Sequence, residues 1–544
     1  MGLGPKGGHA VLLALALMAG CAPKSARTAT AATARPPALA AAATPRPASP
    51  TALSGGAPHS QPTAIPSATA PLPTGTPTPT GTPTPTATPA PPTGTPSPTA
   101  APAVVVSEGI WEVLAYPYAQ HLQQATAAAA PGFSFWRLDW DAYRAAAPQP
   151  APTSWRSLTL ENRWLRVTVL PELGGRVAEL TWKPSGHNQL YSNPVLKPTA
   201  WGPPEQGWWL AAGGLEWCLP VVEHGYLWAE RWTARVEQGP DQAVILLESP
   251  ADQPLVAQIA VAMRPDEAAL RLEFRIHNPS AQNVAFSYWT NAMLAPGGAN
   301  HPSADLRFIY PIERAQVHST GDPRLPGPGQ TLSWPWHGGV RWDRPAMWEG
   351  WLGFFASPRA QHNWAAVYDA QADEGVVRLF PAATAPGLKG FAFASGPRSP
   401  KSDQWTDGGS AYVEMHGGLA PTFQEATALG PGQEVCWTET WFPVAGLGGL
   451  TEAGPGGALH VRRGVADWQV RLQPLRAGRG VLELLAAGGK TLQHEAVQWE
   501  PSRPLLASVP AELLPSGEGL QVRLLDSAGQ AIYEATVTPT LDER

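Results

Sequence analysis

The sequence predicts an all-β protein in which two β-domains follow a long N-terminal segment without a fold of its own. Three observations support this prediction. Apolar and polar residues alternate through most of the chain after residue 104, no helical period persists over a long stretch, and residues 22–104 consist largely of Ala, Thr, Pro and Ser. A period of two places successive side chains on opposite faces of a strand, which is typical of antiparallel sheets with one buried face.

The charge and the composition exclude several classes of protein. The chain has 544 residues, of which 37 are basic, 43 are acidic and only 3 are Cys. Residues 1–107 contain five basic and no acidic side chains, so the rest of the chain contains 32 basic and 43 acidic ones. Such an acidic part lacks the positive potential that binds phosphate backbones, so we expect no nucleic-acid partner. The scarcity of Cys and of long apolar runs excludes a disulfide scaffold and a bundle of transmembrane helices.

Residues 1–21 have the pattern of a lipoprotein signal peptide. Lys6 precedes the apolar run from Ala10 to Gly20, which is too short to span a bilayer and has the length of a signal-peptide core. The run ends in Leu17-Met18-Ala19-Gly20-Cys21, which resembles the bacterial lipobox, in which the Cys is acylated. The alternative is an ordinary signal peptide that contains a Cys. We expect a lipid anchor on Cys21 as the only membrane contact, and a location on the extracytoplasmic face of the cell membrane.

Residues 22–104 are expected to form a disordered stalk. The unit Pro-Thr-Gly-Thr-Pro occurs at residues 73–77, 79–83 and 92–96. A segment of this composition buries too little to offset its conformational entropy, and its prolines favour an extended chain. The sequence therefore predicts a spacer between the anchor and the folded domains.

Residues 105–445 are expected to form the larger β-domain. Leu158 to Leu160 and Leu165 to Val169 predict two strands, joined by a turn at Glu161-Asn162-Arg163. Leu270 to Ile276 alternates apolar with charged residues, which predicts a half-buried antiparallel strand. The stretch 118–130 is the one that favours a short helix.

The C-terminal part is expected to be a small β-sandwich at residues 458–544. Residues 446–457 contain six Gly and no aromatic residue, so they predict a linker that buries little. The strands expected after it share a period of two and lie between Gly-containing turns: Trp468 to Leu472, Val481 to Leu485, Val522 to Leu525 and Ile532 to Val537.

Several motifs in the larger domain resemble a bacterial family called domain of unknown function 5107. They occur in the order of that family and extend over residues 105–445: Leu160-Glu161-Asn162, Val169 to Arg176, Tyr191 to Pro194, Gly213 to Trp217, Ala411 to Gly418 and Trp437 to Pro443. The family is similar to galactose-mutarotase-like proteins. The resemblance implies a large antiparallel β-supersandwich with a sugar-binding cleft, and therefore a mono- or oligosaccharide as the partner.

Glu414 stands where the family places its Glu, which the resemblance implies is the catalytic base at the anomeric hydroxyl. A period of two places Tyr412, Glu414 and His416 on one face of a strand, where they are candidates for gripping sugar hydroxyls. The alternative is a solvated strand face with three ordinary polar residues. His224, in Glu223-His224-Gly225, resembles a substrate-binding His-Gly motif, although a lone His is more often a structural residue.

The stretch Thr290-Asn291-Ala292 departs from the mutarotase pattern Thr-Asn-His. The resemblance places Ala292 at the position of the proton-donating His, and a methyl group transfers no proton. Asn291 remains a candidate ligand for a hydroxyl, and His301 or His416 are candidates to replace the missing acid. Glu216 follows Gly213-Gly214, a pair that permits close approach of the backbone to a ligand. The alternative for Glu216 is a structural ion pair with an Arg such as Arg176.

No metal and no cofactor are expected. The sequence has no His-Glu-x-x-His motif, no paired-Cys spacing and no phosphate-binding Gly-x-x-x-x-Gly-Lys. The spacing of Cys218 and Cys436 leaves both a disulfide and two free thiols open.

The leading hypothesis is a lipid-anchored carbohydrate-binding protein whose mutarotase-like cleft lacks the usual catalytic His. One alternative is an active aldose 1-epimerase or another carbohydrate-active enzyme. The other is a surface scaffold or adhesion protein with a vestigial cleft.

Overall fold

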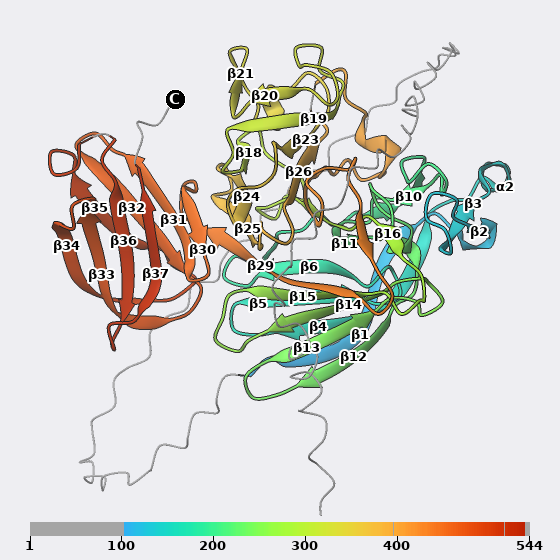
Figure 1. Ribbon diagram of the computed structural model, residues 1–544, viewed down its shortest axis with the longest axis horizontal. Helices are drawn as coiled ribbons and strands as arrows, with labels where there is room; N and C mark the ends of the chain where they lie inside the picture. Colours follow the sequence, from blue (N-terminus) through green and yellow to red (C-terminus); the bar gives the residue numbers. More distant parts are fainter. Residues whose placement is uncertain (1–102, 395, 516, 539–544) are drawn as a thin grey trace, which may run out of the picture. The chain divides into compact units, whose positions relative to one another are not determined.

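The computed structural model describes residues 103–394, 396–515 and 517–538 (Figure 1). The expected signal peptide, its lipobox Cys21 and the stalk up to residue 102 lie outside the described residues.

The first large sheet has 13 strands, and all of its pairings except that of β1 with β8 are antiparallel. In spatial order the strands are β20 (Thr331–Ser333), β19 (Arg314–Thr320), β23 (Leu352–Ala356), β26 (Gly387–Ala392), β27 (Val413–Gly418), β17 (Trp289–Leu294), β11 (Gly214–Cys218), β6 (Arg176–Trp182), β5 (Leu165–Leu170), β4 (Ala151–Glu161), β1 (Val105–Ala115) and β8 (Val195–Leu196), with β7 (His187–Asn188) paired to β6.

The second large sheet has eight antiparallel strands. In spatial order they are β12 (Thr233–Gln238), β13 (Ala243–Glu248), β14 (Val256–Met263), β15 (Leu270–His277), β29 (Glu434–Ala445), β25 (Glu374–Leu379), β24 (Trp364–Asp369) and β18 (Leu306–Ile309).

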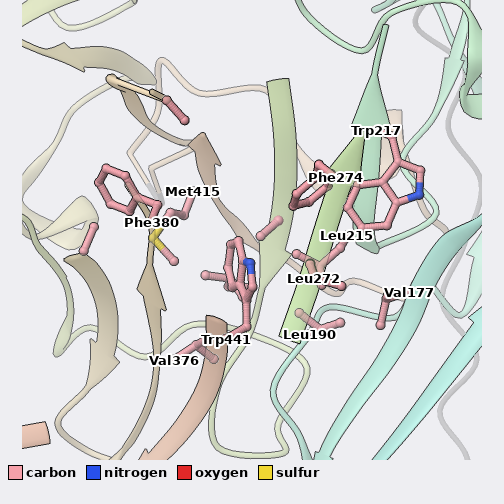
Figure 2. Close-up of a cluster of buried hydrophobic side chains, with 14 of the residues drawn as sticks. Val177, Leu190, Leu215, Trp217, Leu272, Phe274, Val376, Phe380, Met415 and Trp441 are labelled. Carbon is pink, nitrogen blue, oxygen red and sulfur yellow. The ribbon is translucent and has the colours of Figure 1, made fainter. Parts of the chain in front are cut away.

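The two large sheets share one hydrophobic core. Val177 and Leu215 of the first sheet lie in the same buried cluster as Leu272, Phe274 and Trp441 of the second (Figure 2). Alternation along each strand accounts for this arrangement, because every second side chain points to the partner sheet. The predicted antiparallel supersandwich is therefore the observed architecture of the larger domain.

Strand β15 has the alternation that its sequence predicts. Leu270, Leu272, Phe274 and Ile276 are buried, and the charged residues between them point away from the core. There they form ion pairs, with 2.9 Å between Arg271 Nε and Glu273 Oε1 and 2.6 Å between Arg275 Nη2 and Glu434 Oε2. The strands predicted around Leu158 and Val167 are also present, as β4 and β5.

Helical structure is confined to short segments in the described residues. They are the α-helix α2 (Trp140–Ala146) and the 3-10 turns η1 (Ala119–His121), η2 (Leu227–Ala229), η3 (Pro345–Met347) and η4 (Ser402–Gln404). Four small two-stranded sheets complete the larger domain: β2 (Leu122–Thr126) with β3 (Ser134–Leu138), β10 (Trp209–Leu210) with β9 (Pro198–Thr199), β16 (Val284–Phe286) with β28 (Thr427–Leu429), and β21 (Trp336–His337) with β22 (Val340–Arg341).

The helix expected at residues 118–130 is wrong. Only the 3-10 turn η1 forms there, and the chain then enters β2, which pairs with β3 from Leu122 opposite Leu138 to Thr126 opposite Ser134. Pairing with a partner strand outweighs a weak local preference for helix. The α-helix of the domain begins later, where the Asp139 carboxylate accepts a hydrogen bond from the Ala142 amide at 3.0 Å and caps α2.

The C-terminal part contains two four-stranded sheets over one core, as the predicted small β-sandwich requires. One sheet has the order β30 (Glu452–Gly454), β31 (Gly457–Arg463), β32 (Asp467–Pro474), β35 (Leu505–Pro510), and the other has the order β34 (Thr491–Trp499), β33 (Gly478–Ala486), β36 (Leu520–Asp526), β37 (Ala531–Val537). Trp468 and Leu472 of the first sheet share a buried cluster with Leu484 and Leu524 of the second.

Residues 446–457 bury more than their composition indicates. Leu447 is 0% exposed, and it shares a cluster with Leu450, with Phe442 of β29 and with Ala458 of β31. The expectation that this stretch buries little is therefore wrong. Its glycines adopt positive φ, +75° at Gly446 and +72° at Gly448, and the resulting turns bring the two leucines inward.

Among the residues that the structure describes, no helix is long and apolar enough to cross a membrane.

Candidate functional site

Four polar side chains form a row across neighbouring strands of the first sheet, and we call them the polar row. They come from β26, β27, β17 and β11, and each lies directly opposite the next: Lys389, His416, Asn291 and Glu216. Residues opposite one another share a face of the sheet. The residues that precede or follow them, such as Leu215 and Met415, lie in the core, so the polar row is on the face turned away from it.

Asn291 joins the two carboxylates of the site. Its Nδ2 donates to Glu216 Oε1 at 3.3 Å and to Glu414 Oε1 at 3.4 Å. Asn291 Oδ1 is buried and has no hydrogen-bond partner within the described part of the chain. A buried acceptor without a partner destabilises the fold, so a ligand hydroxyl that donates a hydrogen bond to this oxygen would bind favourably.

Glu216 is held from several sides. His224 Nδ1 lies 2.7 Å from its Oε1, while Arg176 Nη2 and Trp209 Nε1 donate to Oε2 at 3.3 and 3.2 Å. Burial raises the pKa of Glu216, but His224 and Arg176 lower it more, so the net pKa lies below the ordinary value. The ion pair with Arg176, which the sequence left as the alternative, is present, and Glu216 acts as an anchor for its neighbours.

His224 is oriented by this anchor and by an aromatic ring. Its imidazole stacks on Trp209, with 3.7 Å between ring centroids and 15° between planes. Burial alone lowers the pKa of His224, but Glu216 reverses this effect and the net pKa is raised. The only hydrogen bond of the His224 ring in the described residues is the one between Nδ1 and Glu216 Oε1, and the side chain keeps 10% of its surface exposed. His224 therefore presents a free ring nitrogen beside the two carboxylates.

His416 lies between a cation and an anion. Its Nε2 is 3.0 Å from Lys389 Nζ and 2.9 Å from Glu414 Oε2. Burial and the charge of Lys389 lower the pKa of His416 to about 4. Burial raises the pKa of Glu414, but the hydrogen bond with His416 and the charge of Lys389 bring it down to about 2. At neutral pH the site thus holds a neutral imidazole next to an ionised carboxylate.

Tyr412 lies outside this hydrogen-bonded cluster. Its ring packs on Tyr191 and Trp405, at centroid distances of 4.8 and 5.9 Å, and it makes no hydrogen bond to the polar row in the described structure. The structure therefore brings together five of the predicted residues, Glu414, His416, Asn291, Glu216 and His224, and leaves Tyr412 as an aromatic neighbour.

The glycines before Glu216 serve the chain itself. A Cβ at Gly213 meets Tyr191 O at 2.0 Å, and a Cβ at Gly214 meets Val177 O at 2.2 Å; both residues have positive φ. The close approach at this Gly pair is thus to neighbouring backbone, which explains why both positions are Gly.

Position 292 does not face the site. Ala292 is fully buried in the core cluster, opposite Leu215 and Met415 on the neighbouring strands. The expectation that an imidazole there would face a ligand is therefore wrong, because successive residues of β17 point to opposite faces and Asn291 occupies the site face. His301 is exposed and lies 2.8 Å from Pro302 O, outside the cluster.

Sequence reasoning missed Lys389 as a site residue. It is the only charged residue in the strand Gly387–Ala392, and the alternation of that strand places it between Gly387 and Phe391 on one face. A lone Lys in an otherwise apolar strand was the available signal.

The polar row is nearly closed to solvent. Its four residues are at most 3% exposed, and neither of two surface cavities, of about 450 and 410 Å³, is lined by residues of the row. Within the described residues no group of His, Cys, Asp or Glu side chains is arranged to hold a metal ion. Cys218 is buried and free, so it forms no disulfide with Cys436.

The sequence and the fold were compared with those of known proteins. Residues 138–444 match the sequence model of the family described as Domain of unknown function (DUF5107). A TPR-domain containing protein from Parabacteroides distasonis shares the fold, with 20% sequence identity and a TM-score of 0.52 over 63% of this chain and 55% of that protein. The chain thus spans about half the length of that protein.

Two further solved structures align over nearly their whole length. A galactose mutarotase-like protein from Clostridium acetobutylicum is 11% identical, with a TM-score of 0.37 over 54% of this chain and 96% of that one. A galactose mutarotase related enzyme from Lactobacillus acidophilus is 11% identical, with a TM-score of 0.36 over 53% of this chain and 97% of that one.

Proposed function

The chain belongs to the family of domain of unknown function 5107, and on this basis we propose that it is a carbohydrate-binding protein whose site is the polar row together with Glu414 and His224. The observation that carries the proposal is the bridge that Asn291 makes between the carboxylates of Glu216 and Glu414.

The chemistry of these groups suits a polyhydroxylated ligand. Glu414 and the unpartnered Asn291 Oδ1 are suited to accept hydrogen bonds from hydroxyls, and the ring of His224, which uses only Nδ1 in its contact with Glu216, is a further candidate contact. Charged acceptors form the stronger hydrogen bonds with hydroxyl groups. Trp209 and Tyr412 are buried aromatic neighbours of the site, where Trp209 stacks on His224 and Tyr412 packs on Tyr191. The side chains of His224 and Glu414 keep 10% and 6% of their surface exposed, which supports entry of a ligand beside them.

We also propose where in the cell the protein is located. The signal-peptide pattern and Cys21 support a lipid-anchored protein on the extracytoplasmic face, with the Pro- and Thr-rich segment as the spacer. The acidic composition of residues 108–544 supports a partner other than nucleic acid.

An aldose 1-epimerase-like activity is the second candidate, and one observation favours it. An ionised Glu414 and a His224 of raised pKa belong to one hydrogen-bonded cluster, in which Asn291 joins Glu414 to Glu216 and Glu216 holds His224, and ring opening requires such a base and acid. Polarimetry of freshly dissolved α-galactose and α-glucose separates this candidate from binding alone.

The test of the proposal is the substitution Glu414→Gln. A glycan array first identifies a sugar that the parent protein binds, and calorimetric titration then compares the variants. A hydrogen bond to a charged group contributes about 1.5–3 kcal/mol, so the affinity is expected to fall roughly tenfold to a hundredfold. The exposed Glu313→Gln is the matched control and is expected to leave the affinity unchanged. Equal affinities of the Glu414→Gln and parent proteins would overturn the assignment of the site.

A further inference from the structure

A surface cavity of about 450 Å³ lies outside the site described above. Residues of β1, β6 and β7 line it, together with residues of the segments 190–194 and 298–300. No residue of the polar row lines this cavity, and neither does Glu414 or His224. Its volume falls within the range of about 300–1,000 Å³ that is usual for sites of small molecules.

One wall of the cavity is preformed. Asn300 Oδ1 accepts a hydrogen bond from the Ser192 amide at 3.0 Å, and Asn300 Nδ2 donates to Ser192 O at 2.7 Å. The backbone of Asn300 has a φ of +52°, in the left-handed region that Asn adopts more readily than most residues. These bonds join the segments 190–194 and 298–300, so a ligand does not have to order them.

Asn188 supplies hydrogen-bond donors to the cavity. Its Oδ1 accepts from the amides of Leu180 and Leu190, at 2.9 and 3.2 Å, and its side chain forms no other hydrogen bond within the described residues. Because both amides donate to the same atom, that atom is the oxygen and the other is the NH₂ group. Both hydrogens of Nδ2 are therefore available to a ligand.

The acceptors of the cavity are carboxylates. Glu179 Oε2 accepts from Thr168 Oγ1 at 2.8 Å, which leaves Oε1 available, and Glu112 is exposed and has no ion pair in the part of the chain that the structure describes. The described residues that line the cavity include no Lys, Arg or His. The carboxylates therefore disfavour an anionic ligand, and the donors of Asn188 disfavour a cationic one.

An aromatic ring completes the lining of the cavity. Trp111 is partly exposed and packs on Trp155, with 5.8 Å between ring centroids and 45° between planes. Sites of small ligands commonly combine aromatic side chains with a few polar groups that fix the orientation of the ligand. A pyranose has hydroxyls at its edge and C–H bonds on its face, so it matches this set of donors, acceptors and an apolar ring.

We propose that this cavity is a second carbohydrate site, which binds an uncharged sugar residue from solvent without chemical change. The inference goes beyond the proposed function, because the two sites share no residue and either can bind a sugar without the other.

The first test is Asn188→Asp in the full chain. The variant keeps an oxygen for the amides of Leu180 and Leu190, removes both donors and adds a negative charge. A glycan array and calorimetric titration with methyl galactoside, methyl glucoside and methyl mannoside measure binding. We expect the affinity for a neutral sugar to fall at least about tenfold. Asn283→Asp, which adds the same charge at an exposed position, is the matched control and should leave the affinity unchanged.

The second test is Trp111→Ala, which removes the aromatic ring and keeps Asn188. The affinity is again expected to fall roughly tenfold. Trp336→Ala, on a side chain that is 38% exposed in β21, is the matched control and should bind like the parent protein. The two variants change different strands, so either one decides the question if the other does not fold.

Charged probes test the chemical class of the ligand. Galacturonic acid should bind at least about tenfold more weakly than methyl galactoside, because the cavity is lined by two carboxylates. Tetramethylammonium should not bind the parent protein. Binding of tetramethylammonium that becomes tighter in Asn188→Asp would show a cation site and overturn the proposal.

The comparison with Glu414→Gln separates this proposal from the proposed function. If Glu414→Gln alone weakens the binding of neutral sugars, the second site is overturned and the proposed function stands. If Asn188→Asp and Trp111→Ala alone weaken it, the second site is supported and the assignment of the polar row fails. Two binding events per chain, each lost in its own variants, support both sites. Absence of binding to every neutral glycan overturns both.

Discussion

At the scale of single residues, the protonation state of His416 is set by the two charged side chains beside it. His416 Nε2 lies within hydrogen-bond distance of both Lys389 Nζ and Glu414 Oε2, and a single ring nitrogen serves only one of them as donor or acceptor at a time. Protonation of His416 would place two cations side by side in a buried site. The protein therefore keeps this imidazole neutral at a pH where an exposed His begins to gain a proton.

This arrangement predicts a pH-dependent loss of stability. The pKa of His416 is about 4 in the folded protein and ordinarily 6.5, so between these values the unfolded chain binds the proton and the folded chain does not. Stability from His416 is fully present above pH 6.5 and is lost as the pH falls toward 4. Between pH 7 and pH 5 the loss is about 2 kcal/mol, and it should be absent from His416→Gln.

Urea unfolding at pH 7 and pH 5, followed by Trp fluorescence, measures this difference. The exposed His494→Gln, in the C-terminal sandwich, serves as the control and should retain the loss of the parent protein. His224 has a raised pKa and contributes in the opposite direction, but it is present in all three proteins, so its effect cancels in the comparison. An equal pH dependence in His416→Gln and the parent protein would contradict the neutral buried imidazole.

At the scale of secondary-structure elements, the strands follow their local pattern and the connections follow their tertiary contacts. Strand β15 buries each residue that its alternation assigns to the core. The stretch 446–457 has the composition of a linker, yet Leu447 and Leu450 enter a cluster that also contains Phe442 and Ala458. A Gly-rich composition indicates that the backbone can adopt many conformations. It does not indicate whether the side chains of the stretch are buried against a neighbouring surface.

The substitution Leu447→Ala tests this packing. Truncation of a fully buried Leu costs about 2–5 kcal/mol, because it leaves a cavity. Local opening of residues 446–457 should therefore become at least about tenfold more populated, and limited proteolysis within the stretch should accelerate accordingly. Leu506→Ala, on an exposed side chain of β35, is the control and should leave the rate unchanged. If Leu447→Ala is cleaved no faster than the parent protein, the stretch is a free linker after all.

At the scale of the whole molecule, the proposal places the lipid anchor at Cys21 and the carbohydrate site in the folded domain, with the Pro- and Thr-rich segment between them in the sequence. Acylation takes place on a thiol, so Cys21→Ser is expected to prevent it. In the native host, the variant should move from the membrane fraction to the soluble fraction or retain its signal peptide. Membrane fractionation and mass determination of the chain measure both effects. Cys218→Ser is the matched control, because it changes a thiol of the folded domain, and it should stay with the membrane. Unchanged fractionation and mass of Cys21→Ser would reject the anchor.

The all-β architecture and much of the candidate site follow from the sequence alone. Alternation assigns a face to each residue of a strand, so the core positions of β15 and the C-terminal strands are predictable locally. Glu414 and His416 are two residues apart on one strand, and this spacing places them on one face wherever the strand lies. The helix expected at residues 118–130 does not form, because Leu122 to Thr126 pair with the strand Ser134–Leu138.

The assembly of the site was decided by the tertiary structure. Glu216, Asn291 and Lys389 are far apart in the sequence, and only the register of β11, β17, β27 and β26 aligns them with His416. Successive residues of β17 point to opposite faces, so Ala292 lies in the core while Asn291 faces the site. A register shift of one residue would exchange the two faces. Burial, which sets the pKa values of His416 and Lys389, likewise depends on what the rest of the fold packs around them.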